Sequence, residues 1–111
     1  MQYYKIEITD LAEADLNDIG DYIAFNLKTP ITALQIMQGL RKEIRKLNQN
    51  PKRHKLDEDL QLASVGIRKH YYKNYTIFYL VDDRENSVLV LRILHILVDS
   101  KRALYYTLEL E

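Results

Sequence analysis

Residues Gly66–His95 read G-I-R-K-H-Y-Y-K-N-Y-T-I-F-Y-L-V-D-D-R-E-N-S-V-L-V-L-R-I-L-H, and this stretch decides the fold. Three runs rich in Ile, Val, Leu, Tyr and Phe cover it, namely Val65–Lys73, Tyr75–Asp82 and Ser87–His95. Short polar segments, K-N and D-R-E-N, separate the runs and have turn composition. Consecutive strands joined by short turns pair antiparallel, so the stretch predicts a three-stranded meander.

The residues before the meander predict one strand and two helices. Tyr4–Thr9 alternates apolar with charged residues, which is typical of a short strand. Asp10 and Glu13 form a capping-box-like helix start, and Thr29 followed by Pro30 marks the start of a second helix. Two helices joined by a few residues pack antiparallel, as a helical hairpin. Their apolar stripes are Ala12, Leu16, Ile19, Ile23 and Leu27, then Ala33, Met37, Leu40, Ile44 and Leu47.

The remaining segments complete one α+β domain over residues 1–111. Pro51–Asp59 lacks periodicity and is predicted to be a polar loop. Asp99 or Ser100 begins a short C-terminal helix that reaches about Leu108. The expected order is strand, helical hairpin, three-stranded antiparallel meander and short helix. We expect the hairpin to cover one face of the sheet and the other face to be partly free.

Three residues carry specific packing predictions. Gly20 lies in the middle of the first helix, where glycine costs about 1 kcal/mol relative to alanine, so we expect a close neighbour there. Tyr22 and Tyr79 are predicted to lie in the core.

Composition narrows the class of protein. The 111 residues include no cysteine, which excludes a disulfide framework and a thiolate metal site. No apolar run approaches the roughly 20 residues of a membrane span. The N-terminus lacks the cationic and apolar pattern of a secretion signal. We therefore expect a cytoplasmic protein without a membrane partner.

Charge is unevenly distributed although the formal net charge is zero. Residues 1–30 carry a net charge of −4 and residues 31–56 a net charge of +6. The basic block is either a solvated helix face and loop or a phosphate-contacting surface. The candidate nucleic-acid contacts are Lys52, Arg53, His54 and Lys55. The neutral total argues against strong nonspecific binding to nucleic acid.

The sequence lacks a phosphate-binding glycine loop, a zinc spacing and a nucleophile elbow. His54, His70 and His95 have no histidine or acid at ligand spacing, so we expect neither a metal site nor a cofactor. Any catalysis must then use His, Tyr, Arg and Lys side chains. That set suits phosphodiester chemistry, in which cations stabilise developing charge and a histidine or tyrosine moves a proton.

Arg68, Arg92 and His95 are candidate functional residues, because charged side chains in strands must find partners or face solvent. Strict alternation along the last strand places Val88, Val90, Arg92 and Leu94 on one face and Leu89, Leu91, Ile93 and His95 on the other. Arg92 is then a cation in a largely apolar strand. The alternative role for Arg92 is a structural ion pair with an acid of the first helix. The alternative role for His95 is a hydrogen-bonded structural residue. Tyrosines that can build a stacking or partner surface are Tyr71, Tyr72, Tyr75, Tyr105 and Tyr106.

Five motifs in order make the chain resemble the RelE/ParE superfamily of toxins from type II toxin–antitoxin modules. They are A-x-x-D-L-x-x-I-x-x-Y-I from Ala12, L-x-x-x-P from Leu47, G-I-R-K from Gly66, N-Y-x-I-F-Y from Asn74 and L-R-I-L-H from Leu91. The resemblance covers nearly the whole chain. It implies a growth-inhibiting toxin, associated with plasmid or chromosome stabilisation, that a small cognate antitoxin neutralises. Members include ribosome-dependent messenger-RNA endonucleases and inhibitors of DNA gyrase.

Two departures bear on the choice between these branches. Thr76 occupies a position where RNA-cleaving members commonly carry a catalytic arginine. Ile96-Leu97-Val98-Asp99 follows the last motif, where many relatives have a small residue, basic residues and Asp. The L-R-I-L-H form is closer to the ParE branch, which implies binding to DNA gyrase without chemistry of its own. One alternative is a RelE-like endonuclease acting on ribosome-bound mRNA, in which Arg68, Arg92 and His95 are the candidate catalytic residues. The other is an inactivated toxin-like module that binds an antitoxin.

The apolar segment Ile96, Leu97 and Val98, together with Tyr75, is the candidate partner-binding surface. Such a segment either binds a partner or is covered by the C-terminal helix. Exposure of Leu97 in the folded chain distinguishes the two. The partner is then the antitoxin, a target protein or a second copy in a homodimer.

Overall fold

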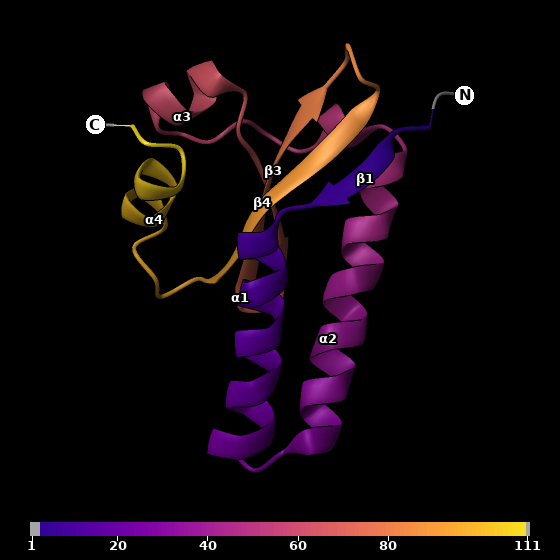
Figure 1. Cartoon of the computed structure of the whole chain (residues 1–111), viewed down its shortest axis with the longest axis vertical. Coiled ribbons are helices and arrows are strands. Elements are labelled where there is room, and N and C mark those ends of the chain that lie inside the picture. The colour runs from indigo at the N-terminus through magenta and orange to yellow at the C-terminus, as the bar shows by residue number, and fades with distance from the viewer. Residues whose placement is uncertain (1–2, 111) are drawn as a thin grey trace.

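Four strands form one mixed sheet in the order β1-β4-β3-β2. The structure, a computed structural model, describes residues 3–110 (Figure 1). The strands are β1 (Lys5–Ile8), β2 (Arg68–Tyr72), β3 (Tyr75–Asp82) and β4 (Ser87–His95). The α-helices are α1 (Asp10–Asp21), α2 (Pro30–Arg45), α3 (Leu60–Val65) and α4 (Ser100–Thr107). A π-helical turn (Tyr22–Asn26) extends α1, and 3-10 turns occur at Lys46–Asn48 and Pro51–Arg53.

The predicted α+β architecture is confirmed. Strands β2, β3 and β4 form the antiparallel meander, and β3 and β4 have the predicted boundaries. The hairpin of α1 and α2 extends from the sheet and is seen side-on in Figure 1. The strand β1 begins at Lys5 and pairs in parallel with β4. Since a parallel pair needs a long crossover, the hairpin and the meander are together the connection between β1 and β4.

Both faces of the sheet are covered, so the prediction of a partly free face is wrong. One core contains residues of α1 and α2 packed on Tyr79, Val88 and Val90 of the sheet. A second core, on α3 and α4, contains Leu62, Ile67, Phe78, Leu91, Leu94 and Leu104. The helix α3 was missed because six residues are too few for a visible helical period. The residues that cap α3 are of the usual types. Asp59 accepts from the backbone N–H of Leu62 at the start, and Gly66 ends the helix with a φ of 99°.

A β-bulge changes the side-chain alternation in β4. Phe78 pairs with Arg92 and its neighbour Tyr79 pairs with Val90, so Leu91 is the extra residue. Val90 and Ile93 therefore both belong to the core on the hairpin side, whereas Leu91 belongs to the other core. Strict alternation is wrong beyond Leu91, because an inserted residue reverses the parity that follows it.

Three predictions about the helices need correction. Thr9, and not Asp10, is the N-cap of α1, since its hydroxyl accepts from the N–H of Ala12 at 3.1 Å. Thr29 is at the predicted N-cap of α2, but its hydroxyl donates to the carbonyl of Ile23 and makes no cap hydrogen bond. Tyr22 is 54% exposed and is not a core residue, unlike the fully buried Tyr79.

Two helical glycines pack against side chains of different stiffness. A methyl group on Gly20 would lie 3.2 Å from the sulfur of Met37, which confirms the predicted close neighbour. A methyl group on Gly39 of α2 would overlap the hydroxyl and ring of Tyr72 in β2. A methionine side chain can adjust by rotation, whereas a tyrosine ring must move as a unit.

We expect Gly20→Ala to raise the free energy of unfolding and Gly39→Ala to lower it or leave it unchanged. Both substitutions gain about 1 kcal/mol of helix propensity. Overpacking against Tyr72 costs about 1–3 kcal/mol, so Gly39→Ala is destabilised or at best neutral, whereas Gly20→Ala is stabilised. Urea unfolding followed by circular dichroism measures both changes. Equal stabilisation of the two variants would contradict the packing at Gly39.

Candidate functional site

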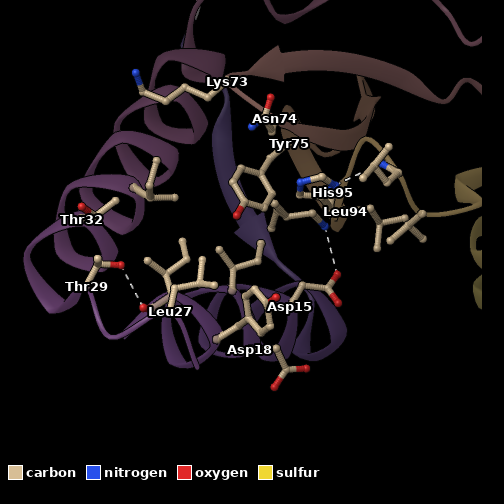
Figure 2. Close-up of a pocket in the computed structure, with 17 residues that line it drawn as sticks. Asp15, Asp18, Leu27, Thr29, Thr32, Lys73, Asn74, Tyr75, Leu94 and His95 are labelled. Atoms are coloured by element: carbon tan, nitrogen blue, oxygen red, sulfur yellow. Dashed lines mark hydrogen bonds between the residues drawn. The ribbon is translucent and has the colours of Figure 1, made fainter. Parts of the chain in front are cut away.

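An open groove of about 750 Å³ lies between the helical hairpin and the adjacent end of the sheet (Figure 2). One wall comes from α1, the π-helical turn and the start of α2. The other comes from the β2–β3 turn, the end of β4 and the segment that follows it. In the view of Figure 2 the Tyr75 ring lies near the middle, with Lys73 and Asp18 on opposite sides. The lining is mostly apolar, which suits a protein segment better than a small polar ligand.

The chain after β4 lines one side of this groove, and its apolar side chains are uncovered. Leu97 is 86% exposed, so α4 does not cover it. Ile96 and Val98 are also exposed. The backbone of the segment is fixed nonetheless, since the Ile96 N–H donates to the Asn74 carbonyl and the Val98 N–H to the His95 carbonyl. The segment is therefore an exposed apolar surface with a fixed backbone, and partner binding by it stays a prediction.

His95 and Tyr75 are two of the polar residues that line the groove. Their rings meet edge to face with centroids 5.4 Å apart. The Leu97 N–H donates to Nδ1 of His95 at 3.1 Å, so the neutral imidazole carries its proton on Nε2. Burial raises the pKa of the Tyr75 hydroxyl, with a smaller contribution from Tyr22. Tyr75 is therefore a proton donor at neutral pH and not a base.

Arg92 is committed to a structural ion pair. Its Nε and Nη2 donate to the two carboxylate oxygens of Asp15 in α1 at 2.7 and 2.9 Å, and its Nη1 donates to Thr107 of α4 at 3.0 Å. The hydrogen bonds that Arg92 donates to Asp15 raise the pKa of Arg92 despite its partial burial. The pairing with an acid of the first helix is the structural alternative that the sequence left open for Arg92.

Arg68 is also held by the protein, far from His95. Its Nη1 donates to the carbonyls of Lys52 and His54 at 3.2 and 2.7 Å. Arg68 pairs with Tyr79 of β3, whereas His95 pairs with Tyr75, which lies four residues earlier in the same strand. Four residues of a strand span about 13 Å. The candidate catalytic residues are therefore not brought together at one site.

The predicted basic loop has its two lysines and its arginine exposed, but two of these cations already have partners within the chain. Lys52 pairs with Asp83 at 2.6 Å, and Arg53 folds back onto the Gln49 carbonyl at 2.6 Å. His54 is partly buried, and Lys55 is exposed. Nucleic-acid binding by this loop stays a prediction.

His54 lies in a polar cluster that the sequence did not reveal. Its ring stacks on His70 of β2 with centroids 4.0 Å apart, and Nε2 of His70 is 2.8 Å from the carboxylate of Glu43 in α2. Burial, followed by the charges of His70 and Arg53, lowers the pKa of His54 to about 4. The three residues are 11 and 16 positions apart along the chain, so no local spacing could have indicated the cluster. Among residues 3–110, no group of three His, Cys, Asp or Glu side chains is placed to hold a metal ion.

Within residues 3–110, every helix is too short or too polar to span a bilayer.

Comparison with known proteins identifies the family. Residues 6–96 match the family described as the ParE toxin of the type II toxin–antitoxin system, parDE. Comparison with curated proteins gave no match.

Solved structures share the fold at low sequence identity. A chain of the chromosomal ParDE toxin–antitoxin system from P. aeruginosa superposes with a TM-score of 0.70 at 22% identity, over 84% of this chain and 96% of that one. A chain of the toxin–antitoxin complex RelBE2 from Mycobacterium tuberculosis gives 0.64 at 24% identity, over 86% and 93%. A mutant of the E. coli toxin RelE in the free state gives 0.61 at 15% identity, over 93% of each chain.

The family match spans most of the chain, including the strand β1, the hairpin and the meander. The α+β topology and the order of the five sequence motifs agree with it. This chain therefore belongs to the ParE toxin family of type II toxin–antitoxin systems.

Proposed function

We propose that this protein is a growth-inhibiting toxin that acts by binding a protein target, DNA gyrase, and is neutralised by a small cognate antitoxin. The observation that carries the proposal is the ordered and uncovered apolar segment at Leu97, beside a large apolar groove. An exposed surface of this kind favours association with another protein. Two of the neighbouring solved structures are toxin–antitoxin systems, which supports an antitoxin as one partner.

The arrangement of the cations supports binding without catalysis. A ribonuclease needs cations directed at a phosphate, together with a proton donor and acceptor. Arg92 is instead bound to Asp15, Arg68 is bound to loop carbonyls, and Thr76 is buried within β3. None of the three offers a cation to the groove. These positions favour the ParE-like branch of the superfamily.

One observation favours a second candidate function, cleavage of mRNA on the ribosome. The His95 and Tyr75 side chains lie together in the groove, and Lys73 lines it as well. A histidine, a tyrosine and a lysine are side chains from which phosphodiester chemistry can be built. An inactivated toxin that only binds its antitoxin is the outcome if neither activity is present.

Target choice is testable by induction in a bacterial host. We expect growth arrest with a DNA-damage response, and inhibition of gyrase supercoiling at micromolar concentrations of the purified chain. Relaxation of the same plasmid by topoisomerase I serves as the control and should be unaffected. Unchanged supercoiling together with mRNA cleavage on translating ribosomes would establish the second function instead. Normal growth on induction would identify an inactive module.

The partner surface is testable with two equally exposed leucines. Leu97 and Leu60 are each 86% exposed, and Leu60 lies in α3 outside the groove. We expect Leu97→Asp to weaken the complex with the cognate antitoxin about 10- to 100-fold, because burial of a leucine contributes about 1.5–3 kcal/mol. Leu60→Asp should bind like the wild type. Calorimetric titration measures both affinities, and equal affinities would exclude Leu97 from the interface.

A further inference from the structure

Residues 51–58 lie along the outer edge of β2 and are attached to the sheet by side chains. The Tyr79 hydroxyl donates to the Pro51 carbonyl at 2.6 Å, and Arg68 donates to the Lys52 and His54 carbonyls. Two backbone hydrogen bonds continue the attachment, from Asp57 N–H to the Ile67 carbonyl and from Lys69 N–H to the Lys55 carbonyl. Lys69 also pairs with Glu58 at 2.6 Å. The segment therefore covers part of an edge strand that would otherwise present unpaired backbone groups.

The His54 ring is the part of this segment inserted against the sheet. It stacks on the His70 face and meets the edge of Tyr79, with centroids 6.4 Å apart. Its Nε2 is buried and has no hydrogen-bond partner within the described part of the chain. A neutral ring tolerates this position, since an unpaired imidazole nitrogen costs far less than an unpaired buried cation. A proton on Nε2 would have no acceptor.

The charges around His54 oppose its protonation. His70 of β2 stacks on the ring, and Arg53 precedes it in the chain. Glu43 of α2 is an acid close to the two stacked histidines. Its carboxylate is already engaged, because it is hydrogen-bonded to Nε2 of His70 and paired with Lys46 at 3.0 Å. The hydroxyl of Tyr79 in β3 already donates its proton to the Pro51 carbonyl. A proton can therefore be accommodated on His54 when the ring leaves the stack and enters water.

From this geometry we infer that His54 is an acid-released latch that holds residues 51–58 against the edge of β2. At neutral pH the uncharged ring stays stacked and the segment is closed. On acidification the ring is protonated in the open form, the segment leaves β2, and the backbone edge of β2 and the guanidinium of Arg68 become available. The inference does not depend on which target the toxin has.

The sign and range of the effect follow from the two forms of His54. The pKa is about 4 in the closed form and ordinary, about 6.5, once the ring is in water. The depressed pKa makes the closed form most stable above pH 6.5, and its stability falls as the pH decreases from 6.5 to 4. The ratio of open to closed segment rises about 30-fold between pH 7.5 and pH 5. Paired carboxylates such as Glu43, whose pKa is lowered by His70, stay ionised over this range.

Hydrogen exchange at single amides tests the latch. Protection factors, which remove the intrinsic pH dependence of exchange, are measured by NMR at pH 7.5 and pH 5. We expect the Asp57 and Lys69 amides to lose protection by 10- to 30-fold relative to amides of the β3–β4 ladder. The variant His54→Phe keeps an aromatic ring in the stack but cannot be protonated, so its protection should not depend on pH. Constant protection in the wild type, or an equal loss in His54→Phe, would overturn the inference.

A direct titration keeps the inference testable if His54→Phe does not fold. The ring-carbon proton of His54 in the wild-type chain is followed by NMR from pH 8 to pH 4. The latch predicts a midpoint at least one unit below 6.5, with shifts of the Lys55 and Asp57 amides following the same curve. A midpoint at or above 6.5, or amide shifts that follow a different curve, would overturn it.

Discussion

The arrangement of this fold depends on the contacts of the Asp15 carboxylate with Arg92 and with the backbone of β4. The strand β1 pairs with β4 only as far as Val90, so the rest of β4 has an open edge on that side. Thr9 takes over the pairing, with its N–H bonded to the Val90 carbonyl and its hydroxyl to the Leu91 carbonyl. Asp15 then accepts the N–H of Ile93 at 3.0 Å while it binds the guanidinium of Arg92. One side chain of α1 thus completes the sheet and fixes the helix to it.

This contact also connects the two cores. Arg92 follows the extra residue of the bulge and reaches both Asp15 of α1 and Thr107 of α4. The helical hairpin on one side and α4 on the other are therefore positioned by the same guanidinium. The groove forms beyond this point, between the end of β4 and the hairpin, and Asp15 itself contributes to its wall. Arg92, a candidate catalytic cation in the sequence, therefore has a structural role instead. It positions the elements that form the groove, which we assign to a partner.

Sequence periodicity predicted the regular elements because their apolar residues recur at clear spacings. The strands β3 and β4 and the starts of α2 and α4 agree closely with prediction. The failures have local physical causes. The helix α3 is too short to show a period, the bulge at Leu91 reverses the alternation, and Tyr22 lies in a π-helical turn. The partner role of Leu97 stays a prediction from the sequence, whereas the stack of His54 on His70 required the fold to be known.

The most direct test of this account is a double-mutant cycle on Asp15 and Arg92. The free energy of unfolding in urea is measured for the wild type, Asp15→Ala, Arg92→Met and the double variant. Removal of one partner of a largely buried pair typically costs about 3–5 kcal/mol, because the other charge is left without compensation. The account predicts that the double variant loses at least about 2 kcal/mol less than the two single losses combined. Losses that add to within about 0.5 kcal/mol would contradict a fold organised around this contact.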